Sequence, residues 1–203
     1  MFDRFMQELR QQRWDDHRHY HHCRINQSLH FISALCFVVA YGLLWVNPAW
    51  SALLAWCVSM TTRQAGHFFF EPRGYDEVNQ VTDEVKEAIK VGYNIRRKVF
   101  LMAAAAAAPL GVWMWMQFHQ GIQPTAHIET YLSQVGWVWL LVGAVGLVVR
   151  VAQLWWQQNS LVAAVWATKI ITDPFHDLVL YHKAPLALLR GERYDPMLHV
   201  VSH

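Results

Sequence analysis

Four long apolar runs dominate the pattern of hydrophobic and polar positions along the chain. They cover residues 29–46, 49–70, 99–118 and 135–156. Each run is close to the roughly 20 mostly apolar residues that a bilayer-spanning helix needs. Tryptophan stands near the ends of these runs, as is typical of segments that meet a membrane–water interface. The pattern therefore predicts an all-α integral membrane protein with four transmembrane helices.

The distribution of lysine and arginine predicts how these helices are oriented. Five of these residues precede the first run, six lie between the second and third runs, and four follow the fourth. The two remaining links contain none. Because cytoplasmic loops carry an excess of Lys and Arg, both termini and the middle loop are expected in the cytoplasm. The membrane would be the inner or plasma membrane of a bacterium, or the endoplasmic reticulum of a eukaryote.

The cytoplasmic segments are predicted to form amphipathic helices. Within residues 76–98, valine and isoleucine recur three or four positions apart. They form one apolar stripe, suited to a helix on the membrane surface or against the bundle. Near the C-terminus, Asp173 is expected to cap a helix that begins at Pro174. The chain, residues 1–203, is expected to form a single membrane domain.

Composition excludes several classes of protein. Apolar residues make up 54% of the 203 residues and charged residues 16%, which is not typical of a disordered chain or a coiled coil. A net charge of +2 argues against a strongly basic nucleic-acid-binding protein. The odd number of cysteines predicts free thiols at Cys23, Cys36 and Cys57. Residues 1–28 are charged and rich in histidine, unlike a cleavable signal.

Histidine is concentrated on one side of the predicted membrane. The chain has twelve histidines, and the predicted orientation places ten of them on the cytoplasmic side, several at one membrane depth. An imidazole or carboxylate near hydrocarbon is costly unless it is paired or bound to a ligand. Imidazole suits iron, zinc, copper and nickel, and several imidazoles with a carboxylate suit non-haem iron. The candidate metal ligands are His21, His22, His30, His67, His176 and His182.

Local spacing separates these candidates. His67 is the strongest, because Gly66 permits a close helix approach and Glu71 lies four residues on, on the same helix face. His21 and His22 are adjacent and point in different directions on a helix, so both bind only if the backbone or a second metal allows it.

Neighbouring charges also separate the remaining histidines. Asp173 and Asp177 are placed to orient His176 through hydrogen bonds. By contrast, His17 and His19 are expected to be solvated, because their segment is polar.

Two segments resemble a known family. HHCRINQSLHFI (21–32), a short membrane hairpin and RQAGHFFFEP (63–72) are similar to the small membrane proteins of the 2-hydroxy-fatty-acid dioxygenase type. These proteins remove one carbon from 2-hydroxy fatty acids during α-oxidation. The shared pattern is a histidine, a second histidine nine residues later, a hairpin, and Gly-His followed by aromatic residues and a glutamate. His21, His30, Gly66, His67 and Glu71 occupy those places, and the resemblance covers about residues 17–100.

The resemblance implies a non-haem Fe(II) site, O₂ as co-substrate and a long-chain acyl substrate that enters from the bilayer. Glu71 would serve as a ligand or a proton acceptor. Arg63 or Arg73 would pair with the substrate carboxylate, since arginine offers a bidentate fork. The simpler explanation of both arginines is the excess of positive charge on the cytoplasmic side.

Three alternatives remain open from the sequence. The first is a lipid hydroxylase or desaturase-like oxidase that binds two irons. The second is a metal-binding or transport protein without catalysis; a transporter should carry ionisable residues near mid-membrane, and the first, third and fourth runs have almost none there. The third is a structural subunit of a larger membrane complex, which would bind no metal.

Overall fold

Helices form every regular element in the described part of the chain. The computed structural model describes residues 2–71, 74–76, 79–89, 91, 95–121 and 123–196. The elements are α1 (Phe2–Tyr20), α2 (Arg24–Leu44), α3 (Pro48–Leu54), the π-helix η1 (Ala55–Met60), α4 (Thr61–Phe69), α5 (Asp83–Ile89), α6 (Ile95–Trp115), the π-helix η2 (Met116–Gln120), α7 (Ile128–Gln157), α8 (Ser160–Tyr181) and α9 (Ala184–Leu189). The predicted all-α fold class is confirmed.

Three helices are long and apolar enough to cross a membrane. They are Arg24–Leu44, Lys98–Gln120 and Ile128–Gln157, which correspond to the first, third and fourth predicted spans. The second predicted span, residues 49–70, is a continuous run of α3, η1 and α4. A π-helical segment divides it into shorter helices, so a membrane span over residues 49–70 stays a prediction.

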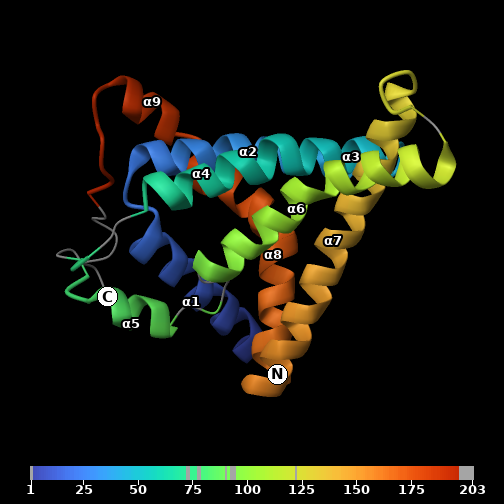
Figure 1. Ribbon diagram of the computed structural model, residues 1–203. Coiled ribbons are helices and arrows are strands. Elements are labelled where there is room, and N and C mark those ends of the chain that lie inside the picture. Colours follow the sequence, from blue (N-terminus) through green and yellow to red (C-terminus); the bar gives the residue numbers. More distant parts are fainter. Residues whose placement is uncertain are drawn as a thin grey trace.

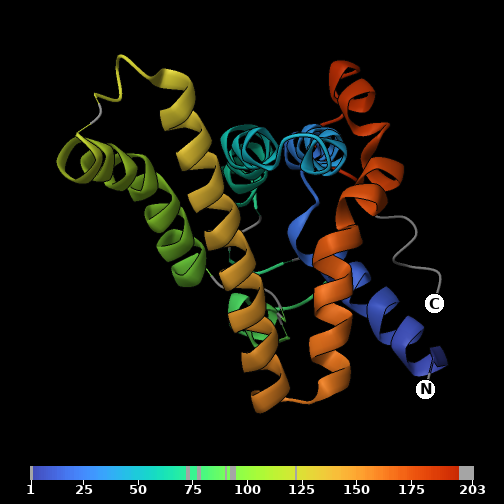
Figure 2. The same cartoon turned by 90° about the vertical axis from the view of Figure 1, so that its right-hand side faces the viewer.

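The helices are arranged as two hairpins that cross. α2 and the run from α3 to α4 form the first hairpin, joined by a tight turn in which the Asn47 side chain accepts a hydrogen bond from the Trp50 backbone N–H. α7 and α8 form the second hairpin, and Figures 1 and 2 together show that the first hairpin lies across it. In Figure 2 the first hairpin is seen end-on between the upper arms of α7 and α8. This crossing brings α2 against α8, and Arg63 near the start of α4 reaches Asp177 in the C-terminal part of α8.

Indole N–H groups and small residues join α6 and α7 to the first hairpin. Trp139 Nε1 donates to the Ala105 carbonyl oxygen at 2.7 Å, and Trp56 Nε1 donates to the Trp139 carbonyl oxygen at 3.1 Å. A Cβ atom at Gly136 would come within 2.3 Å of the Ala49 carbonyl oxygen. α7 and α3 therefore pack backbone against backbone at this point.

Ion pairs with the buried side chains of Lys169 and Asp173 dock α1 onto α8. Lys169 pairs with Asp16 of α1 and, at 2.8 Å, with Asp173 of its own helix. Arg13 of α1 lies 3.2 Å from Asp173. Burial opposes the charge of Lys169, but the two carboxylates outweigh it and raise its pKa above the ordinary value. Removing one partner from such a buried set leaves an uncompensated charge, so these contacts fix the position of α1.

The expected solvation of His17 and His19 is wrong. Their exposed fractions are 4% and 2%. The physical reason for His17 is the docking of α1, which places its Nδ1 atom 3.2 Å from the Tyr181 hydroxyl of α8.

The expected helix start at Pro174 is also wrong. α8 begins at Ser160 and continues through Pro174 to Tyr181. Its cap is Asn159, whose side chain accepts a hydrogen bond from the Val162 backbone N–H. The carboxylate of Asp173 pairs with Lys169 instead of capping a helix.

The predicted helix over residues 76–98 is interrupted. Asp76 and Val81 form an isolated antiparallel bridge, α5 covers Asp83–Ile89, and α6 begins at Ile95. Residues 77–78, 90 and 92–94 lie outside the described part of the chain. The apolar stripe is therefore divided between separate elements.

Candidate metal centre

Three histidines from separate segments converge at one point. Each of His21, His30 and His67 offers a ring nitrogen that lies within 4.8 Å of the other two. His21 and His30 are 5% and 0% exposed, and His67 is half-buried. Among the described residues, this is the one group of three or more His, Cys, Asp or Glu side chains with such spacing. Three of the six predicted ligands are therefore brought together.

Buried amides hold the segment that carries His21. This residue lies in the short link between α1 and α2, where its side chain is not fixed by a helix. The Asn26 amide donates to the Tyr20 carbonyl oxygen and the Gln27 amide donates to the His21 carbonyl oxygen, both at 2.8 Å. Both amides belong to the first turn of α2, so the link is fixed onto the same helix that carries His30.

Gly66 brings α4 against α2, as the sequence predicts. A Cβ atom at this position would lie 2.2 Å from Asn26 Oδ1 and 3.4 Å from His30 Cδ2. At a separation below 3 Å the neighbouring atom must move, so any larger residue here would displace the Asn26 side chain, whose amide holds the Tyr20 carbonyl oxygen. The close approach places His67 beside His30, with ring centroids 4.9 Å apart.

The facing nitrogens of His21 and His30 suit a metal ion. Their Nε2 atoms are 3.2 Å apart, and Nδ1 of His21 is buried without a hydrogen-bond partner. Burial, together with the neighbouring imidazoles, lowers the pKa of His21 well below its ordinary value. His21 is therefore neutral at pH 7, the form that binds metals. This donor set fits the borderline metals that imidazole prefers.

Glu71 orients His67 from behind. Its Oε2 atom lies 2.8 Å from Nδ1 of His67, and Lys98 Nζ lies 4.0 Å from the same oxygen. The predicted proximity of His67 and Glu71 is confirmed, but Glu71 lies two residues beyond the end of α4 and not on the same helix face. A carboxylate on one ring nitrogen fixes the tautomer and directs the other nitrogen to a metal. In this arrangement Glu71 supports a ligand instead of joining the group of three.

Asp177 stands behind His30, but without the hydrogen bond that Glu71 makes to His67, because Nδ1 of His30 is buried without a hydrogen-bond partner. Its Oδ2 atom lies 3.5 Å from His30 Nδ1 and 2.8 Å from Nη1 of Arg63. Nη2 of Arg63 also lies 4.0 Å from Asp173. Two of the three histidines therefore have a carboxylate next to Nδ1, and each carboxylate has a cation beside it.

The other predicted ligands lie outside the group of three. Nε2 of His22 contacts the Arg18 carbonyl oxygen and lies 3.8 Å from Asp76. His176 is half-buried on α8, where burial lowers its pKa. Nδ1 of the exposed His182 lies 2.8 Å from the Val179 carbonyl oxygen. Their roles as ligands stay predictions, and Arg73 lies outside the described residues.

Sequence reasoning did not place two residues of the site. Asp177 was expected beside His176, but its carboxylate faces His30 and Arg63. Tyr181 was not predicted at all, and its ring lies 5.7 Å from that of His21. Burial raises the pKa of the Tyr181 hydroxyl well above its ordinary value. The available signal was the spacing of four that puts Asp177 and Tyr181 on one face of α8.

A cavity extends from the three histidines into the helical body. Its volume is about 500 Å³, and its lining includes His21 and His67 at one end. Apolar residues of η1, α7 and α8 form much of the remaining wall, among them Met60, Leu147 and Ile170. The candidate metal centre therefore has space for a ligand of small-molecule size.

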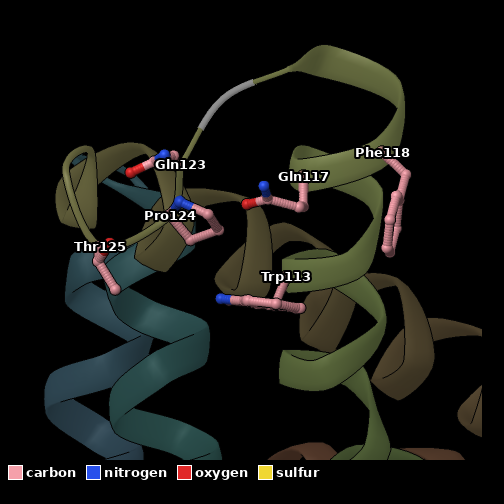
Figure 3. Close-up of a pocket in the computed structure, with 6 residues that line it drawn as sticks. All are labelled: Trp113, Gln117, Phe118, Gln123, Pro124 and Thr125. Atoms are coloured by element: carbon pink, nitrogen blue, oxygen red, sulfur yellow. The ribbon is translucent and has the colours of Figure 1, made fainter.

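A second pocket lies away from the histidines, between the end of α6 and the loop before α7. Its volume is about 440 Å³. Figure 3 shows Trp113 and Gln117 pointing toward the loop of Gln123, Pro124 and Thr125. Its lining includes none of the predicted site residues, so this pocket adds nothing to the metal centre.

Searches of protein-family models, curated proteins and solved structures found no match to this chain. The resemblance to the 2-hydroxy-fatty-acid dioxygenase type therefore stays a prediction that rests on His21, His30, Gly66, His67 and Glu71.

Proposed function

We propose that the protein is a membrane-bound Fe(II)-dependent oxygenase that shortens long-chain 2-hydroxy fatty acids by one carbon. One observation carries the proposal: three imidazole nitrogens converge within 4.8 Å at the end of a largely apolar cavity. Neutral histidines without a full protein ligand set leave metal positions open for O₂ and substrate. The cavity beside them suits an apolar tail.

His21, His30 and His67 would hold the iron. When bound, Fe(II) would supply a site at which O₂ meets the hydroxyl and carboxylate groups of the substrate. The overall conversion balances with one O₂ and no further reductant, because the 2-hydroxy acid yields the shorter acid, CO₂ and water. Because the conversion balances in this way, the protein needs to provide only binding, orientation and proton transfer.

The chain's own residues have distinct roles in this proposal. Glu71 accepts the hydrogen bond of Nδ1–H of His67 and so holds the tautomer whose other nitrogen faces the metal position. Arg63 lines the cavity beside His67, presents positive charge to a substrate carboxylate, and holds Asp177 against His30. Tyr181 packs against the rings of His21 and His30 and shields them from water.

The single cluster favours one metal over two. An oxidase with two irons needs a second group of ligands, and the part of the chain that the structure describes holds one such group. A metal-binding protein without catalysis would share the same three histidines. Consumption of O₂ distinguishes the oxygenase from this non-catalytic protein.

The test is metal content followed by oxygen uptake. The protein is purified in detergent, loaded anaerobically with Fe(II), and its iron measured per chain. O₂ consumption is then compared for a 2-hydroxy fatty acid and the unhydroxylated acid of equal length. We expect one iron per chain and uptake only with the hydroxylated acid. Two irons would favour the di-iron oxidase, iron without uptake a non-catalytic protein, and no bound metal would overturn every metal-based function.

The proposal includes a cytoplasmic site, with both termini on that side of the membrane. It is supported by the distribution of lysine and arginine. Asp3→Cys and Thr125→Cys, each in a chain without its native cysteines, provide a matched pair of exposed positions. In intact cells, a membrane-impermeant maleimide should label Thr125→Cys alone. Labelling of Asp3→Cys alone would reverse the proposed orientation.

A further inference from the structure

One face of the continuous helix formed by α3, η1 and α4 follows the cavity. Ala52, Trp56, Met60, Gln64 and His67 recur three or four positions apart, and all of them line the cavity. Residues with this spacing lie above one another on a helix. The cavity therefore runs along the helix, away from the metal centre at His67.

Two tryptophans stand in the half of the cavity remote from His67. Trp56 and Trp139 both line it, with ring centroids 6.3 Å apart. Each indole N–H is engaged, Trp56 with the Trp139 carbonyl oxygen and Trp139 with the Ala105 carbonyl oxygen. Trp139 is 9% exposed and belongs to the apolar core around Ala52. Hydrogen bonds and packing therefore fix both rings as part of the cavity wall, and the lining continues past Trp56 to Ala52 and Leu44.

The distance from this wall to the metal centre matches an acyl chain. Trp56 and His67 are eleven positions apart on a continuous run of π- and α-helix, which corresponds to at most about 16 Å, the length at the α-helical 1.5 Å per residue. One leaflet of a membrane's hydrocarbon core is about 15 Å thick, half of the roughly 30 Å of the whole core. A single acyl chain of ordinary membrane length would thus reach from His67 to the tryptophans.

The two halves of the cavity differ in polarity. Arg63 and Lys98 line it close to His67, and their side chains are 19% and 13% exposed. Leu44 and Leu140 line it elsewhere, with Trp56 and Trp139. The lining also includes Lys169, Asp15, Asp16 and Asp173. Charges of both signs together with an apolar surface fit an amphiphile with a polar head and one tail.

The opposite wall contains a position where the cavity can be filled. Gly143 of α7 lines the cavity, and a Cβ atom added there meets no other atom within 4 Å. A larger side chain at this position would therefore begin in open space at the cavity lining. Gly111 of α6 is equally open but lies outside the cavity lining, so it provides a matched control.

We infer that Trp56 and Trp139 set the length of the acyl chain that the protein accepts, as the wall that a tail meets when its carboxylate lies near His67. The inference rests on the proposed function for the chemistry at the polar end. It concerns binding alone, so it is tested without iron and without turnover.

The test measures which fatty acids remain bound. Metal-free protein is incubated with an equimolar mixture of unbranched saturated fatty acids of increasing length, purified again, and its bound acids are quantified by mass spectrometry. Wild type, Trp56→Ala, Gly143→Leu and Gly111→Leu are compared. We expect a sharp upper length limit in wild type. Gly143→Leu should lower this limit by about four carbons, the number that its side chain adds to a close-packed space, and Trp56→Ala should raise it.

The outcomes separate this inference from the proposed function. Gly111→Leu should leave the limit unchanged. An unchanged limit in Gly143→Leu, or no fatty acid bound by folded wild type, would overturn the inference even if Trp56→Ala failed to fold. If the length limit moves as expected but the protein binds no iron, the tail cavity stands and the oxygenase function fails.

Discussion

Nε2 of His21 faces Nε2 of His30 at 3.2 Å, although one residue lies in the link after α1 and the other within α2. Without an ion, one ring must donate its Nε2 proton to the other. With an ion, both rings can turn a lone pair toward the same point, which His67 also reaches. This relationship makes the metal-binding capacity of the chain testable residue by residue.

The metal should depend on His67 and not on His182. His67→Ala removes one of three converging nitrogens, so we expect the iron content after anaerobic loading to fall from one per chain to near zero. His182→Ala is the control, because that exposed side chain contacts the Val179 carbonyl oxygen. Elemental analysis of both purified variants checks this. Full iron retention in His67→Ala would contradict the assigned centre.

The carboxylates behind the histidines should tune the affinity for the metal. Glu71→Gln keeps the shape of the side chain but removes the charge next to Nδ1 of His67. Loss of such a partner typically weakens metal binding by about 10–100-fold. We expect this weakening in a competition titration with an Fe(II) chelator.

Asp177→Asn should weaken binding through His30 in the same titration. Glu129→Gln, an exposed change at the start of α7, should leave affinity unchanged. Equal affinities in all three variants would mean that neither carboxylate supports a ligand.

Gly66 should tolerate no side chain. A Cβ atom would come 2.2 Å from Asn26 Oδ1. Forcing extra atoms into a packed contact costs about 1–3 kcal/mol, more than the gain of up to about 1 kcal/mol in helix propensity. Gly66→Ala should therefore lower the melting temperature and weaken iron binding. Gly42→Ala, where nothing lies within 4 Å, should melt no lower than wild type. Equal melting of the two variants would contradict the close helix approach.

Metal-free protein should lose stability as the pH falls below about 6.5, the ordinary histidine pKa. Burial lowers the pKa of His19, as it does for His21 and His176. These histidines contribute stability that is fully present above the unfolded pKa. It is lost as the pH falls toward the lowered folded pKa, because the unfolded chain then binds protons that the folded chain excludes.

Thermal melting between about pH 8 and pH 5 checks this pH dependence. His19→Gln removes one titrating ring and should give a shallower loss of stability than wild type. A melting temperature of metal-free wild type that does not change over this range would show that the buried histidines do not govern its acid stability.

Much of the site was predictable because membrane depth is encoded in composition. Apolar length and the placement of lysine and arginine located His21, His30 and His67 near one level, and the small residue Gly66 indicated a close contact. The burial of His17 and His19 was not predictable in this way. It depends on how α1 docks through ion pairs such as Asp16–Lys169, whose partners are far apart in the sequence. When the partner helix is unknown, a polar and charged segment is predicted to be exposed to solvent, whether or not another helix covers it.

Asp177 illustrates a different limit. Its spacing relative to His176 is local and suggested a partnership between neighbours. The crossing of the two hairpins instead brings α8 against α2, so the carboxylate meets His30. A pattern within one helix identifies which residues share a face, but the angle at which helices cross decides what that face meets.

The π-helical segment Ala55–Met60 determines how α4 is rotated about the helix axis relative to α3. A π-helical turn accommodates an additional residue relative to an α-helix, and each α-helical residue corresponds to about 100° of rotation at 3.6 residues per turn. If one residue were deleted from this segment and ordinary α-helical winding resumed, α4 would turn by about that angle relative to α3. Arg63 and His67 would swing away from Asp177 and His30 while their own surroundings in the sequence stayed intact. A deletion about two helical turns upstream of His67 would thus dismantle the candidate metal centre without changing any of its three histidines.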